Sequence, residues 1–194
     1  MLCLLRKELK EFLYDYKSWL VVLISVSLPY LLTFAGKEDS PCFYLSIVIS
    51  SISQYVYNSF VSDTKTKNII FVYNIESNSK KNFFAKISIA LILLLIIFVF
   101  NINYILEYVP LINIIWITFF SVTTVAIMYF TAMFSQSSET TSVILTFIVI
   151  FVYTFLLWNM DFIILKIGIS LASAILMSFI AIKTADSIIY RQQL

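Results

Sequence analysis

Residues 62–82, SDTKTKNIIFVYNIESNSKKN, are the longest water-compatible stretch between two hydrophobic blocks of the chain. A polar run (62–68) is followed by seven mostly apolar residues (69–75) and then by a polar, basic run (76–82). This order is typical of a short helix that lies across the base of a membrane bundle and offers one apolar face to another protein. Because the blocks on both sides are long enough to cross a bilayer, the stretch has to face the cytoplasm or a partner.

The hydrophobic blocks decide the fold class. Of the 194 residues, 61% are hydrophobic and 12% are charged, which excludes an ordinary soluble domain. A hydrocarbon core about 30 Å thick needs about 20 apolar residues per helix, and continuous runs such as 87–100 lack the alternation of a barrel strand. We therefore expect an all-α polytopic protein, a single transmembrane domain over residues 1–194, with six spans at about 19–35, 42–61, 84–106, 111–134, 142–160 and 162–182.

The basic residues predict the orientation. If the N-terminus is cytoplasmic, eleven of the thirteen basic residues fall on the cytoplasmic side and two, Lys37 and Lys166, fall outside. This bias satisfies the positive-inside rule with both termini in the cytoplasm. The eleven are Arg6, Lys7, Lys10, Lys17, Lys65, Lys67, Lys80, Lys81, Lys86, Lys183 and Arg191.

Residues 1–18 have the pattern of an amphipathic helix in the cytoplasmic interface. Charged residues occupy one side of this helix, with bases placed to meet anionic headgroups. A simple membrane-surface helix and a helix that transmits motion from a partner both fit this pattern. The apolar face consists of Leu5, Leu9, Phe12, Leu13 and Tyr16.

The second predicted span carries a polar stripe at intervals of three and four residues. Hydroxyl and amide groups are costly in hydrocarbon unless they are paired, so the stripe is expected to face other helices or water. It can serve as a helix-packing seam, as the lining of a translocation path, or as both. The stripe consists of Ser46, Ser50, Ser53, Gln54, Tyr57 and Asn58.

Three smaller features concern residues near span ends. We expect Lys86 to extend its ammonium group to the cytoplasmic surface, and Lys166 to form a surface ion pair with Asp161. Small residues recur every four positions at Ser170, Ala174 and Ser178, which predicts close approach of another helix.

Several kinds of chemistry lack the residues they need. Gly36 and Gly168 are the only glycines, so the chain has no phosphate-binding loop and cannot hydrolyse ATP alone. There is no histidine, and the two cysteines, Cys3 and Cys42, fall near opposite membrane faces, which excludes a Cys/His metal site. The apolar blocks hold no ionisable residue near their centres, which disfavours ion-coupled transport. If the chain moves a cargo, the energy for that transport therefore has to come from another protein.

The order of motifs resembles the membrane subunit of a type 2 ABC exporter. The N-terminal helix contains Arg6-Lys7-Glu8-Leu9-Lys10-Glu11-Phe12, the first span contains Pro29, and the second ends in the acidic Asp63. A loop helix follows, and residues 79–86, SKKNFFAK, open the third span. The sequence departs from the family in having Thr66-Lys67 where members commonly carry a Gly-Thr pair.

This resemblance implies a permease subunit that works with cytoplasmic ABC ATPase subunits and with a second membrane subunit, identical or related. The chain itself would be no enzyme and would bind no cofactor, because ATP and Mg²⁺ would sit on the ATPase. Residues of about 64–76 would form the coupling helix, and the turn 135–141 a lesser contact. The implied ATPase-coupling residues are Asp63, Lys67, Ile69, Ile70, Phe71, Tyr73 and Ile75.

The expected function is alternating-access export of an apolar or amphipathic cargo, such as a peptide, a bacteriocin or a drug, across the cytoplasmic membrane of a bacterium. The partners would be the ATPase, the second membrane subunit and the lipid bilayer, with no nucleic acid. Two alternatives stay open, a non-transporting immunity or scaffold subunit and a secondary carrier.

Overall fold

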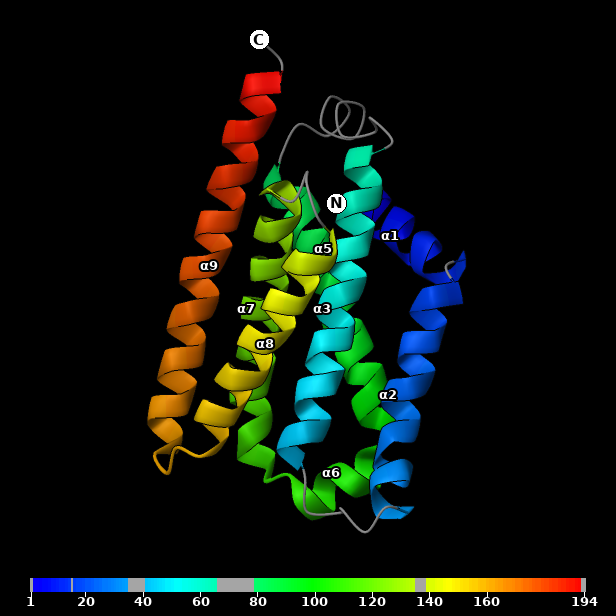
Figure 1. Cartoon of the computed structure of the whole chain (residues 1–194), viewed down its shortest axis with the longest axis vertical. Coiled ribbons are helices and arrows are strands. Elements are labelled where there is room, and N and C mark those ends of the chain that lie inside the picture. Colours follow the sequence, from blue (N-terminus) through cyan, green and yellow to red (C-terminus); the bar gives the residue numbers. More distant parts are fainter. Residues whose placement is uncertain (1, 15, 35–40, 66–78, 135–138, 193–194) are drawn as a thin grey trace.

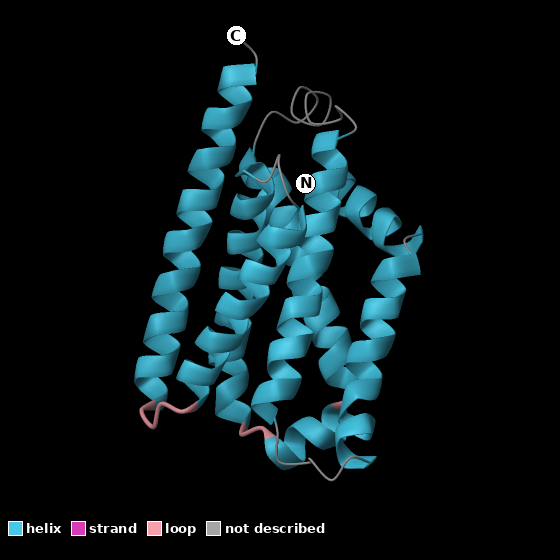
Figure 2. Ribbon diagram, viewed as in Figure 1, coloured by secondary structure: helices cyan, strands magenta, loops and turns pink. Residues whose placement is uncertain are grey.

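The computed structural model describes residues 2–14, 16–34, 41–65, 79–134 and 139–192. Over these ranges every regular element is a helix, which confirms the predicted all-α class (Figures 1 and 2). The helices are α1 (Leu2–Tyr14), α2 (Tyr16–Phe34), α3 (Pro41–Lys65), α5 (Ser79–Phe100), α6 (Ile102–Tyr108), α7 (Leu111–Phe134), α8 (Glu139–Trp158) and α9 (Ile163–Gln192).

Three of the described helices contain segments long and apolar enough to cross a membrane, and this indicates a membrane protein. The segments are Lys80–Phe100, Leu111–Ala132 and Ile163–Ser187. Shorter apolar segments, Val22–Leu32 and Ile148–Trp158, lie in α2 and α8. Helix α3 is comparably long, with 25 residues, but it carries the serines and amides of the polar stripe. The count of six spans therefore stays a prediction.

The predicted third span, 84–106, is not one continuous helix. Helix α5 ends at Phe100, Asn101 forms a turn, and the short helix α6 begins at Ile102. Helix α6 lies across the end of the bundle opposite to the C-terminal end of α9 (Figure 1). The apolar run alone did not reveal this break, because only Asn101 and Asn103 interrupt it near its end.

The turn at Asn101 is fixed by buried polar contacts. The Asn101 side-chain amide donates to the hydroxyl of Tyr44 at 2.9 Å and to the backbone carbonyl of Ser25 at 3.3 Å. The ring of Tyr44 in turn packs edge-on against Tyr104 of α6, with ring centroids 5.2 Å apart. Asn101 therefore joins α2, α3 and the α5/α6 junction at one point.

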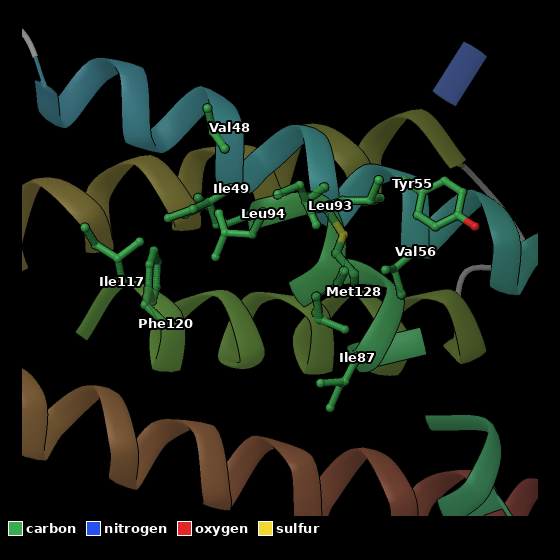
Figure 3. Packing of buried hydrophobic residues seen from close by; sticks show 14 of the residues in the cluster. Val48, Ile49, Tyr55, Val56, Ile87, Leu93, Leu94, Ile117, Phe120 and Met128 are labelled. Atoms are coloured by element: carbon green, nitrogen blue, oxygen red, sulfur yellow. The ribbon is translucent and has the colours of Figure 1, made fainter. Parts of the chain in front are cut away.

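Helix α3 lies at the centre of the bundle. It packs against α2, α5, α7 and α8, and most of its side chains are buried. Figure 3 shows its Val48, Ile49 and Val56 among Leu93 of α5 and Ile117 of α7. A movement of α3 would therefore change its packing against four other helices.

Helix α9 packs along α7 at the edge of the bundle (Figure 1). Ser170 and Ala174 are buried, as their small-residue spacing predicts. The hydroxyls of Thr123 and Ser173 lie 3.1 Å apart and link the two helices, and the Tyr153 hydroxyl of α8 donates to Ser173 at 3.4 Å. Close approach and hydroxyl bonds together hold these three helices side by side.

Candidate functional site

One end of the bundle gathers the elements for which the sequence predicts a role in coupling. Helix α1, the C-terminal end of α3 and the N-terminal end of α5 all lie at this end (Figure 1). Asp63 belongs to the last turn of α3. The other predicted coupling residues, Lys67, Ile69, Ile70, Phe71, Tyr73 and Ile75, lie outside the described residues, as does most of the predicted turn 135–141.

Helix α1 turns a different face toward the bundle from the one that the apolar spacing predicts. Leu4, Glu8 and Phe12, spaced by four residues, are buried. Within the predicted apolar face, Phe12 is buried and Leu5 partly buried, whereas Leu9, Leu13 and Tyr16 are exposed. The apolar face is thus shared between the bundle and the surroundings, and a carboxylate lies in the middle of the packed side.

Glu8, Ser59 and Lys86 form a closed triangle of hydrogen bonds, which we call the ion triangle. The Lys86 ammonium donates to Glu8 Oε1 at 2.9 Å and to Ser59 Oγ at 2.7 Å. The Ser59 hydroxyl donates to Glu8 Oε2 at 2.8 Å. The hydroxyl of Tyr55 also donates to the backbone carbonyl of Glu8 at 3.2 Å. The ion triangle therefore joins α1, α3 and α5.

The prediction that Lys86 reaches the surface is wrong. The side chains of Lys86 and Glu8 are each only 1% exposed. A buried charge is tolerated when a counter-charge and hydrogen bonds replace its water, and the ion triangle supplies both. Removing one partner of such a pair typically costs about 3–5 kcal/mol, because the other charge is left buried and unpaired.

Aromatic rings pack between the helices of this end of the bundle. Phe12 of α1 packs edge-on against Tyr55 of α3, with ring centroids 5.5 Å apart. Tyr129 of α7 packs against Phe60 of α3 at 4.5 Å and against Phe83 of α5 at 5.2 Å. Ring packing and buried charge together make this end of the bundle a continuous contact network.

The polar stripe of α3 divides into two halves. Ser46, Ser50, Ser53 and Tyr57 are buried inside the bundle. Ser53 Oγ donates to Thr124 Oγ1 of α7 at 2.9 Å, which makes this half a packing seam between α3 and α7. Helical spacing places Gln54 and Asn58 one residue, or about 100°, beyond Ser53 and Tyr57, but it does not show which of the two faces is buried.

The other half of the stripe lies on a face of α3 that the other described helices leave partly exposed. Asn58 is exposed and Gln54 is partly exposed. Their side chains bond to each other, since Gln54 Nε2 donates to Asn58 Oδ1 at 3.1 Å. Phe43, Ile47 and Ser51 continue this face at the same helical spacing. We call residues 43, 47, 51, 54 and 58 the open face of α3.

Lys166 has a different partner from the one predicted. Its side chain is largely buried, and Nζ donates to the backbone carbonyl of Trp158 at 3.1 Å. A lysine suits this place, because the last carbonyls of a helix lack intrahelical donors and α8 ends at Trp158. Asp161, its predicted partner, is exposed. Lys166 therefore caps α8 instead of forming a surface ion pair.

The groups at this end of the bundle bond chiefly to one another. Among the described residues, no group of three or more His, Cys, Asp or Glu side chains is placed to hold a metal ion. The ion triangle uses its carboxylate, hydroxyl and ammonium in bonds to one another, which suits holding helices together. No protein-family model, no curated protein and no solved structure matches the chain.

Proposed function

We propose that this chain is the permease subunit of an ATP-binding cassette exporter, driven by a separate cytoplasmic ATPase. The observation that carries the proposal is the docking of α1, through buried Glu8, onto α3 and α5. These two helices are the ones that flank residues 66–78, the segment with the pattern of a partner-binding helix. An ATPase that moved this segment would move the centre of the bundle.

The distribution of charge supports a cytoplasmic location for this end. Exposed basic side chains cluster in α1 and in the first turn of α5, at Arg6, Lys10, Lys80 and Lys81. At the opposite end, the exposed Glu107 and Asp161 lie in α6 and in the turn before α9 (Figure 1). The positive-inside rule then favours six spans with both termini in the cytoplasm.

The open face of α3 supplies a surface for the second membrane subunit or for the cargo. Exposed amides at Gln54 and Asn58 are costly against lipid, so protein or water is expected to cover them. In this proposal ATP binding closes the ATPase pair and pushes on residues 66–78, and the bundle then rocks between its two open states. Apolar or amphipathic cargo, such as a bacteriocin-like peptide or a hydrophobic drug, fits a path with few charges.

The test is ATP hydrolysis by an ABC ATPase that co-purifies with the chain, with both reconstituted in lipid. The triple variant I70S/F71S/Y73S is expected to abolish the stimulation of hydrolysis by the chain. The matched control, L106S/L111S/I112S, removes three exposed apolar side chains at the opposite end and is expected to leave stimulation intact. Unchanged stimulation in the first variant would exclude the coupling role and leave a non-transporting immunity or scaffold subunit.

A secondary carrier is the second candidate, and the ion triangle favours it. Ionisable residues buried in a membrane bundle often mark ion-coupled transport, and Lys86 lies within an apolar segment long enough to span. Cargo uptake into vesicles separates the two mechanisms. Uptake that continues without ATP and collapses with the ion gradient would support the carrier and reject the exporter.

A further inference from the structure

Helix α1 packs on the bundle through one side. Within residues 4–14, Leu4, Glu8 and Phe12 are buried and Leu5 packs partly buried against the core. An isolated helix of 13 residues is marginal in water, so these docking contacts contribute to the placement of α1. Glu8 is the central one of the three buried residues, and it is the position whose contacts reach both α3 and α5 through hydrogen bonds.

The ion triangle fixes α1 in one register. Each edge of the triangle is a hydrogen bond of 2.9 Å or less, and the two charges are almost completely withdrawn from solvent. A rotation or a one-residue slip of α1 would replace Glu8 on the packed side and leave the ammonium of Lys86 buried without its counter-charge. Such intermediate positions are costly, so α1 is either docked or released.

The ion triangle lies close to both ends of the proposed coupling segment. Ser59 precedes the end of α3 at Lys65 by six residues, and Lys86 follows the start of α5 at Ser79 by seven. At 1.5 Å per residue, each lies within about 11 Å of its helix end along the axis. A displacement of residues 66–78 therefore reaches the ion triangle from both sides.

We infer that Glu8, Ser59 and Lys86 are positioning residues that make α1, α3 and α5 move as one unit. The ion triangle adds hydrogen bonds and a charge pair to the apolar contacts by which α1 packs on the two helices that flank the coupling segment. The consequence for transport rests on the proposed function, since only a driven segment needs such a linkage. The linkage itself can be measured without any ATPase.

The experiment measures distances between spin labels on the full chain in lipid nanodiscs. One label pair, on K10C and K81C, reports on α1 and α5 at exposed positions, and a control pair, on I115C and L165C, reports on α7 and α9. Both pairs are made in a C3S/C42S background. With the native ion triangle, the first pair is expected to give one narrow distance distribution.

Glu8→Gln is expected to broaden the K10C/K81C distribution and to leave the control pair narrow. The charge-reversed variant E8K/K86E restores an ion pair between α1 and α5 and is expected to narrow the distribution again. That rescue distinguishes positioning by charge from a merely structural role. An unchanged distribution in Glu8→Gln, equal broadening of both pairs, or failure of the reversed pair to narrow it would each overturn the inference.

The two proposals fail in different measurements. If Glu8→Gln releases α1 but I70S/F71S/Y73S leaves ATP hydrolysis unchanged, the ion triangle is a helix lock in a protein that is not an exporter. If hydrolysis responds to the triple variant but Glu8→Gln does not alter the α1–α5 distances, the exporter stands and the linkage is rejected.

Discussion

The side-chain amide of Asn101 donates a hydrogen bond to the backbone carbonyl of Ser25, 76 residues earlier. That carbonyl lies one helical turn before Pro29, which lies inside α2 and has no N–H to offer it. The break between α5 and α6 thus supplies a donor at the place where the proline of α2 removes one. Interrupted helices in membranes need such compensation, because lipid offers no water.

Replacing Asn101 tests this compensation. Asn101→Leu is expected to lower the free energy of unfolding by about 1–3 kcal/mol, because it leaves a buried carbonyl without its donor. Pro29→Ala restores a backbone N–H, so the double variant P29A/N101L should lose less than the two single effects predict. Thermal unfolding in detergent measures the stability of the wild type, of P29A, of N101L and of the double variant, which together make a double-mutant cycle. Strict additivity of the two changes would show that the defects are independent.

Single and double changes in the ion triangle should differ sharply. Glu8→Gln is expected to cost about 3–5 kcal/mol of stability, because it removes the carboxylate that pairs with the buried Lys86 ammonium. Lys86→Met is expected to cost less, because Lys7 Nζ lies 3.9 Å from Glu8 Oε1 and Ser59 still donates to the carboxylate. The double variant E8Q/K86M removes both charges and is expected to recover much of the loss in Glu8→Gln. Melting curves in lipid nanodiscs give the comparison.

Lys81 provides the control for this cycle. It is exposed in the first turns of α5, five residues from Lys86. Lys81→Met is expected to change stability by less than about 0.5 kcal/mol, as is usual for surface substitutions. A loss equal to that of Lys86→Met would contradict the role assigned to burial.

Substitutions in the two halves of the polar stripe are expected to have different effects, on stability in the buried half and on association or transport in the exposed half. Ser53→Ala removes a buried bond to Thr124 and is expected to cost about 1 kcal/mol of stability. Asn58→Leu lies on the open face of α3 and should leave the melting temperature unchanged while altering self-association or cargo movement. Light scattering and melting curves on the two variants would separate these effects. Destabilisation by Asn58→Leu instead would assign both halves to internal packing.

The orientation in the membrane can be read from thiol labelling in intact cells. In a C3S/C42S background, K81C is expected to react only after the cells are permeabilised, because its end of the bundle is the basic one. D161C, exposed at the opposite end, is expected to react with an impermeant maleimide from outside. The reverse pattern would place residues 66–78 outside the cell and exclude a cytoplasmic ATPase as their partner.

The sequence predicted the helices well and their interruptions less well. Runs such as 87–100 are apolar at nearly every position, so their length and the lack of strand alternation sufficed to recognise α5. The break at Asn101 depends on Tyr44 and Ser25, which are remote in sequence. A local pattern carries no information about such partners.

The same limit explains the error at Lys86. A lysine near the end of an apolar run ordinarily extends to the surface, and nothing nearby contradicts that rule. Its counter-charge, Glu8, occurs in a helix whose other charges suggested a water-facing side. The signal that could have indicated the pair is the spacing of Leu4, Glu8 and Phe12, which puts one carboxylate between two apolar residues on a single helical face.

The ion triangle also sets an order of events during synthesis. Glu8 leaves the ribosome 78 residues before Lys86, so α1 has no charged partner in α5 until that helix has been made. At a translation speed of about 5–20 residues per second, this wait lasts about 4–16 seconds. Until then Glu8 can meet only its α3 partners, Tyr55 and Ser59, and the arrival of Lys86 completes the ion triangle.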